Sequence, residues 1–167
     1  SGRVQMKNTY NLVSDIYNLV STKEVAEGVD IESCIELFGE NVKDLMRKEF
    51  TEVRDDSRKL RMSNIGRDER FLWNVYNDVE KGEDITPPTY VKFLYGHLIE
   101  ELLLFLTRAA GHKVTDEQKK CEVNGIKGSM DCRIDGIVTD VKSTSTFGFK
   151  KFKEGTLAYD DPFGYIG

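Results

Sequence analysis

The chain has 167 residues and a net charge of −5, with 39% hydrophobic and 32% charged residues. These values are typical of a globular protein and argue against a disordered or membrane-embedded chain. The length is sufficient for one domain with a hydrophobic core. The negative charge excludes a protein that coats nucleic acid through bulk positive charge, although a local basic patch can still bind phosphates.

The cysteine pattern and the apolar runs exclude several further classes. Cys34, Cys121 and Cys132 are widely spaced and form no C-x-x-C pair, which argues against a disulfide framework, a zinc knuckle and an iron–sulfur cluster. We expect them to be buried thiols. The longest apolar run, 102–106, is too short to span a bilayer, and no basic segment followed by an apolar one opens the chain. We therefore predict a cytoplasmic protein with no membrane partner.

The first half of the chain is predicted to be helical. Apolar residues recur at helical spacing in three segments between residues 8 and 80. They are Leu12, Val13, Ile16, Tyr17 and Val20, then Ile35, Phe38, Val42, Leu45 and Met46, then Leu72, Val75, Tyr76 and Val79. Asp30 is a candidate N-cap of the second helix. Gly82 and the stretch ending in Thr86-Pro87-Pro88 should close the third.

The diproline divides the predicted regions: a helical N-terminal region over 1–85 and a second region over 86–167. The second region should open with an apolar helix over 91–110 that lies against the core and ends at Gly111. β-Branched residues and the turn pairs at 124–125 and 135–136 then predict at least three antiparallel strands. The expected fold class is α+β, with helices followed by a small mixed or antiparallel sheet.

The predicted hairpin around Asp135-Gly136 brings two acids together. A two-residue turn pairs Ile134 with Ile137 and, counting outward, Asp131 with Asp140 as a non-hydrogen-bonded pair about 4.5 Å apart at Cα. Like charges directly opposite are unfavourable, so this pair needs either a raised pKa on one acid or a cation between them. Oxygen ligands suit Mg²⁺ or Mn²⁺.

Two further residues extend this acidic cluster. Lys142 lies two positions beyond Asp140 and so projects from the same face of its strand. In the preceding helix, either Glu100 or Glu101 is expected to point inward. We favour Glu100, because Gly96 shares its face and permits close approach. Glu101 is expected on a polar, partly solvated stripe.

His97 lies three positions before Glu100 and is either a fourth ligand or a capping or packing residue. We expect His97 to lie on the same partly solvated stripe of the helix as Glu101. Taken singly, an acidic pair in a helix or a D-x-K triplet is also typical of a solvated surface.

The order of these motifs resembles a known nuclease family. G-x-x-x-E at 96–100, G-x-x-D at 128–131 and D-x-K at 140–142 are similar to the motifs of the PD-(D/E)XK nuclease superfamily, in particular its RecB-like and phage lambda exonuclease branch. The resemblance covers residues 90–153. It implies a core of the restriction-endonuclease-like type in an Mg²⁺- or Mn²⁺-dependent deoxyribonuclease.

The resemblance also assigns roles to individual residues. Glu100, Asp131 and Asp140 would hold the metal together with the backbone carbonyl of Val141. Lys142 would position or activate the attacking water. This assignment agrees with the general chemistry of metal-assisted hydrolysis. Asp135 is interpreted only as the turn residue.

The chain departs from the family pattern at both ends. The first half carries no matching motif, so its helices are interpreted as a gating element or as a contact for a second copy or a partner protein. The Q-x-x-x-Y helix of this branch is missing after the lysine strand, which suggests a nuclease domain truncated at its C-terminus. Cysteines for an iron–sulfur cluster are missing too. A phage origin would place the protein in the host cytoplasm.

A basic and aromatic stretch after the lysine strand is a candidate DNA contact. Its lysines and hydroxyls suit phosphate contacts and its aromatics suit stacking on splayed bases. The alternative is an amphipathic segment with phenylalanines in the core. The polar candidates are Ser143, Ser145, Lys150, Lys151 and Lys153, interleaved with Phe147, Phe149 and Phe152.

Three functions are compatible with these patterns. The first is a DNA exonuclease that uses a metal-activated water. The second is a structure-specific endonuclease of the resolvase type with the same site. The third is a non-catalytic DNA- or protein-binding module on a degenerate nuclease fold. Kinase, P-loop and Ser-hydrolase functions are excluded because G-x-x-x-x-G-K-[ST] and G-x-S-x-G do not occur.

Overall fold

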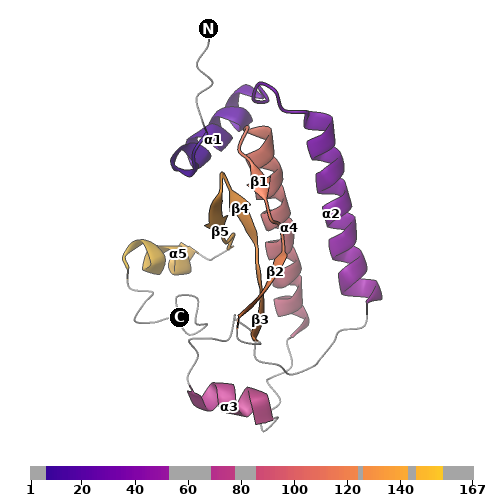
Figure 1. Cartoon of the computed structure of the whole chain (residues 1–167), viewed down its shortest axis with the longest axis vertical. Coiled ribbons are helices and arrows are strands. Elements are labelled where there is room, and N and C mark those ends of the chain that lie inside the picture. The colour runs from indigo at the N-terminus through magenta and orange to yellow at the C-terminus, as the bar shows by residue number, and fades with distance from the viewer. Residues whose placement is uncertain (1–6, 53–68, 78–85, 124–125, 143–145, 156–167) are drawn as a thin grey trace.

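The computed structural model describes residues 7–52, 69–77, 86–123, 126–142 and 146–155. It is a helix-rich α+β fold with a three-stranded antiparallel sheet and a two-stranded ribbon (Figure 1). The predicted α+β class and the antiparallel strands are thus confirmed. The helical elements are η1 Thr9–Asn11, α1 Leu12–Thr22, α2 Ile31–Thr51, α3 Glu69–Asn77, α4 Pro87–Ala109 and α5 Thr146–Lys153. The strands are β1 Val114–Thr115, β2 Lys119–Val123, β3 Ile126–Met130, β4 Cys132–Ile134 and β5 Ile137–Thr139.

The three helices predicted in the first half are present as α1, α2 and α3. Asp30 caps α2: its carboxylate accepts the Ser33 amide at 3.3 Å and the Ser33 hydroxyl at 2.7 Å. The predicted N-cap is therefore confirmed. The end of the third predicted segment, with Gly82, lies outside the described residues.

Helix α4 is the long element against which the others pack. It begins at Pro87, earlier than predicted, because proline is tolerated in the first helical turn, where its missing N–H has no partner to lose. Helices α1 and α2 pack along it (Figure 1). Only its C-terminal half enters the core, where Leu104 and Ala109 are buried, whereas Phe93 and Tyr95 are exposed. The expectation that the whole apolar helix lies against the core is wrong for its first half.

A glycine ends α4 as predicted. Gly111 has a φ of +89°, its N–H donates to the carbonyl of Arg108 at 2.9 Å, and the N–H of His112 donates to the carbonyl of Thr107 at 3.1 Å. These two bonds satisfy carbonyls that a helix end otherwise leaves unpaired. The chain therefore turns sharply, and His112 is buried directly behind the helix.

The core consists of two small clusters along the buried half of α4. In one, Leu19 of α1 packs on Ala109 and Ala110. In the other, Leu104 packs on Cys132 and Ile134 of β4, which is the central strand of the β1-β4-β5 sheet. Alternate residues of β4 thus face α4, as strand geometry requires. This packing places the sheet on the helix that carries Glu100.

The cysteines and the helix lengths bear on two further expectations. Cys34, Cys121 and Cys132 are all free, and Cys132 is buried while the other two are half-buried, so buried thiols were predicted correctly only for Cys132. In the part of the chain that the structure describes, the helices lack the combination of length and apolar character needed to cross a membrane.

Replacing Gly111 by alanine is expected to lower the free energy of unfolding by more than about 1 kcal/mol. The positive φ disfavours any side chain, and an added Cβ would lie 2.8 Å from the Cβ of Ala26. Gly39 in α2 is the matched control, because an added Cβ there meets nothing within 4 Å. Gly39→Ala should stabilise by roughly 0.5–1 kcal/mol. Urea denaturation of both variants measures the free energy of unfolding. A change of the same sign in the two variants would contradict the prediction.

Candidate functional site

The β4–β5 hairpin has the register that the sequence predicts. Ile134 lies opposite Ile137, so the connection is the two residues Asp135 and Gly136. Their φ values of +49° and +84° are those of the type I′ turn that favours such a pair. Further out, Cys132 lies opposite Thr139. The next residues outward, just past the ends of both strands, are Asp131 and Asp140.

These two aspartates, called the acid pair below, are joined by a hydrogen bond between their carboxyl groups. Burial, followed by this bond, raises the pKa of Asp131 to about 7. Burial would also raise the pKa of Asp140, but hydrogen bonds with Asp131 and Lys142 outweigh it and lower that pKa. One proton on Asp131 therefore relieves the repulsion, which is one of the two outcomes expected for opposed acids.

Asp131 lies at the break between the two antiparallel ladders. Lys119 pairs with Met130 in one sheet and Thr115 pairs with Arg133 in the other, so residues 116–118 and 131–132 lie between the two ladders. The carbonyl of Asp131 accepts the amide of Gln118 at 2.8 Å across this break.

The adjacent glutamates of α4 face different neighbours. Glu100 is 19% exposed, and burial raises its pKa; His97, Glu101, Lys142 and Asp140 contribute smaller electrostatic effects. His97 Nδ1 lies 3.8 Å from its carboxylate. Glu100 is therefore the glutamate on the side of the acid pair, as favoured from the sequence.

Glu101 turns toward α2 instead. Its Oε2 accepts a hydrogen bond from Nδ2 of Asn41 at 2.9 Å, and the contact is partly buried. The His97 side chain is 54% exposed and Glu101 is half-buried, which agrees with the partly solvated stripe predicted for them, and the polar partner of Glu101 comes from α2. The position of α2 was not readable from the spacing within α4.

Of the remaining predicted site residues, Lys142 contacts the acid pair. Lys142 Nζ lies 3.1 Å from Asp140 Oδ1, and Val141 between them is half-buried. Lys150, Lys151 and Lys153 are on α5, which follows the hairpin in the chain (Figure 1). The predicted contacts Ser143 and Ser145 lie outside the described residues, as does the predicted turn at 124–125, although Val123 and Ile126 on either side of that turn are paired.

The donor set fits a hard divalent cation in its chemistry. Three carboxylates and a backbone carbonyl are the oxygen ligands that Mg²⁺ and Mn²⁺ prefer. Within the described ranges, no three acidic, histidine or cysteine side chains are grouped around one point as metal ligands. The acids of the pair are bonded to each other in this arrangement, so binding a cation would require the shared proton to leave.

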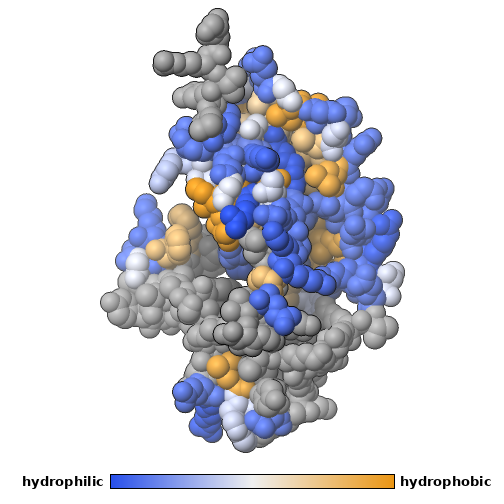
Figure 2. Space-filling model, in the orientation of Figure 1, coloured by the Kyte–Doolittle hydropathy of each residue, from blue (hydrophilic) through white to orange (hydrophobic). Residues whose placement is uncertain are grey.

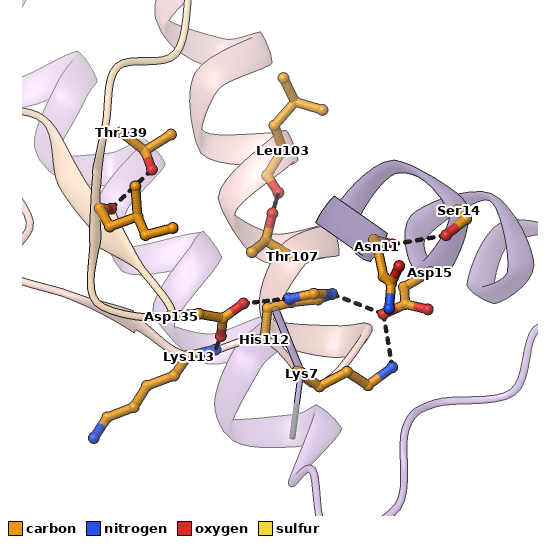
Figure 3. A network of polar contacts seen from close by, with 11 residues as sticks. Lys7, Asn11, Ser14, Asp15, Leu103, Thr107, His112, Lys113, Asp135 and Thr139 are labelled. Carbon is orange, nitrogen blue, oxygen red and sulfur yellow. Dashed lines mark hydrogen bonds and ion pairs between the residues drawn. The ribbon is translucent and has the colours of Figure 1, made fainter. Parts of the chain in front are cut away.

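A second polar cluster was missed by sequence reasoning. His112 lies between two carboxylates, with Nδ1 2.6 Å from Oδ2 of Asp135 and Nε2 2.9 Å from Oδ2 of Asp15 (Figure 3). Asp135 Oδ1 also accepts the amide of Lys113 at 2.9 Å. The interpretation of Asp135 as only a turn residue is therefore wrong. A histidine directly after the helix-ending glycine was the only signal available, because its partners are 23 and 97 residues away.

Comparison with family models, with curated proteins and with solved structures gave no match. The functional assignment therefore depends on the residues of this chain and their geometry.

Replacing Asp131 by asparagine should make the protein more stable at high pH. The raised pKa of Asp131 means that its protonated form favours folding, so the contribution of Asp131 to wild-type stability falls as pH rises from 3.8 to about 7. An asparagine side chain has no proton to lose over this range. Above pH 7 we expect Asp131→Asn to exceed wild type by up to about 1 kcal/mol, the upper range for a solvent-screened cross-strand pair.

The measurement is thermal unfolding at a series of pH values without divalent metal. Asp44→Asn, an exposed change in α2, serves as the control and should differ from wild type by the same small amount at each pH. A difference between Asp131→Asn and wild type that does not grow between pH 4 and pH 7 would contradict the shared proton.

Proposed function

We propose that this chain is a metal-dependent DNA nuclease, and specifically an exonuclease, of the PD-(D/E)XK type that its motifs resemble. The observation that carries the proposal is the acid pair: Asp131 and Asp140 lie side by side at the open end of a hairpin, bonded to each other, with Lys142 3.1 Å from Asp140. Glu100 approaches this group from α4. Perturbed carboxyl groups clustered with a lysine are typical of functional sites.

Each residue would have a distinct task. Glu100 and the acid pair, with the carbonyl of Val141, would hold the cation. When bound, Mg²⁺ or Mn²⁺ would generate a hydroxide-like water and neutralise charge on the phosphate. The ammonium group of Lys142, held beside Asp140, would orient the attacking water and offset negative charge that develops on the phosphate oxygens.

Helix α5 supplies a surface suited to DNA. Phe149 and Phe152 are 56% and 65% exposed, so the alternative in which the phenylalanines enter the core fails for these two. Helical geometry places them on one arc, bordered by Lys153 and Lys150. Figure 2 shows hydrophobic and hydrophilic side chains together on this part of the surface. Lysines would contact phosphates, and the rings would stack on unpaired bases.

A protein-binding role is a second candidate, and α1 is the element that favours it. Val13 and Tyr17 of α1 are 60% and 69% exposed and lie four positions apart on one side of the helix, and Tyr10 of the preceding η1 is 94% exposed. An exposed apolar stripe of this kind is typical of an interaction surface. Binding of a second copy or of a partner protein at this stripe is compatible with both a catalytic and a degenerate nuclease fold.

Cleavage of DNA tests the enzymatic proposal. End-labelled linear DNA and circular DNA, single- and double-stranded, are incubated with Mg²⁺, Mn²⁺ or EDTA. We expect metal-dependent cleavage that requires an end, and loss of roughly 100-fold or more in Asp140→Asn and in Lys142→Ala, as when one preorganised charged group is removed from an active site. Lys43→Ala, an exposed change in α2, is the control and should cleave like wild type.

The outcomes of this assay separate the candidate functions. Equal cleavage of circular DNA would favour the structure-specific endonuclease. Cleavage that persists in EDTA or in Asp140→Asn would overturn the assigned site. DNA binding without any cleavage would favour the non-catalytic module.

Salt dependence tests the proposed DNA contact on α5. Each phosphate contact that a lysine makes contributes about 0.7–0.9 to the slope of log affinity against log salt. We therefore expect the double variant Lys150→Ala with Lys153→Ala to lower the slope by up to about 1.8, measured by fluorescence anisotropy in EDTA. Lys43→Ala should leave the slope unchanged. An unchanged slope in the double variant would remove α5 from the interface.

A further inference from the structure

His112 joins three parts of the fold through one buried ring. Its side chain is 0% exposed and lies directly after α4. One ring nitrogen faces Asp15 of α1 at 2.9 Å, and the other faces Asp135 of the hairpin turn at 2.6 Å (Figure 3). These three residues are called the carboxylate bridge below.

Each carboxylate of the carboxylate bridge also has a second hydrogen-bond donor. Asp15 Oδ2 also accepts the ammonium of Lys7 at 2.8 Å, and this bond is the main reason that the pKa of Asp15 is lowered. Asp135 accepts the amide of Lys113 through its other oxygen. His112 therefore lies between two carboxylates that are each also held by a second hydrogen-bond donor. Charge-assisted bonds of this kind are short and directional.

The bridge acts at the end of the hairpin opposite to the acid pair. Asp135 is held twice, since its N–H also donates to the carbonyl of Lys113 at 2.8 Å. Asp135 lies four positions after Asp131 along the strand, a distance of about 13 Å at the usual rise. Tilting so short a lever by roughly 10° about the turn would move the far end by about 2 Å, more than a metal site tolerates.

We propose that His112 is a positioning residue, whose bonds to Asp15 and Asp135 set the tilt of the β4–β5 hairpin on α4 and thereby the placement of the acid pair opposite Glu100. The consequence for metal binding rests on the proposed nuclease function. The link itself lies wholly among α1, the end of α4 and the hairpin turn.

Asp135→Asn is the informative variant. Asparagine also favours the positive φ of a type I′ turn, so the turn is retained while the negative charge facing His112 is removed. Asp15→Asn cuts the bridge on the α1 side without touching the hairpin. The control is Asp30→Ala, which removes the N-cap of α2 and destabilises the fold at a place remote from the hairpin.

Two readouts distinguish positioning from a loss of stability. The first is the backbone amide chemical shifts of Glu100, Asp131 and Asp140 in NMR spectra of the fully folded proteins. The second is Mn²⁺ affinity, measured by electron paramagnetic resonance. In Asp135→Asn we expect shifted amide signals at the acid pair and at least about 10-fold weaker Mn²⁺ binding, as when an outer-shell partner is lost. Asp30→Ala should lower the melting temperature but change neither readout.

The results that would overturn the proposal are equally specific. If Asp135→Asn and Asp15→Asn both show the same amide shifts and the same Mn²⁺ affinity as wild type, His112 has only a structural role. Asp15→Asn decides the question if Asp135→Asn does not fold. Failure of the wild-type protein to bind Mn²⁺ would instead count against the nuclease proposal, and the amide shifts would then decide by themselves whether the bridge holds the hairpin.

Discussion

The type I′ turn at Asp135-Gly136 is the constraint on which the candidate site depends. Side chains alternate between the two faces of a strand, so a turn longer by one residue would shift every pair. Cys132 and Ile134 would then leave the core, and Asp131 would no longer meet Asp140. Two independent forces hold the register: the positive φ values of the turn pair and the burial of β4 against Leu104. The acids gain their proximity from packing that has nothing to do with their own chemistry.

Two carboxylates this close repel each other, and neighbouring groups in the site reduce the repulsion. A proton on Asp131 and the ammonium of Lys142 offset the charge of Asp140, and Glu100 adds a third carboxyl under partial burial. In the proposed function a cation takes the place of the proton. The same burial that raises the pKa of Asp131 strengthens the attraction of the group for a divalent ion, because the local dielectric is lower than in water.

The helical first half does more than enclose the core. Helix α2 binds Glu101 through Asn41 and so leaves Glu100 as the acid that faces the hairpin. Helix α1 contributes Asp15 to the carboxylate bridge and Leu19 to the apolar contact with the end of α4. Helix α2 therefore acts on the site through its contact with α4, and α1 acts on it by holding the hairpin turn. A partner bound on the exposed stripe of α1 would act on the element that carries Asp15.

Local patterns in the sequence determined the helices, the N-cap at Asp30, the helix end at Gly111 and the register of the β4–β5 hairpin. All of these depend on residues within a few positions of one another, where propensity and turn geometry are decisive. Tertiary structure decided that Asn41 of α2 binds Glu101 and that Asp135 binds His112 as well as making the turn. Those features join residues up to 60 positions apart, and no local periodicity encodes which distant side chain will meet a given face. The acid pair belongs to both groups, because the turn aligns its residues, while burial and the hydrogen bonds with each other and with Lys142 shift their pKa values.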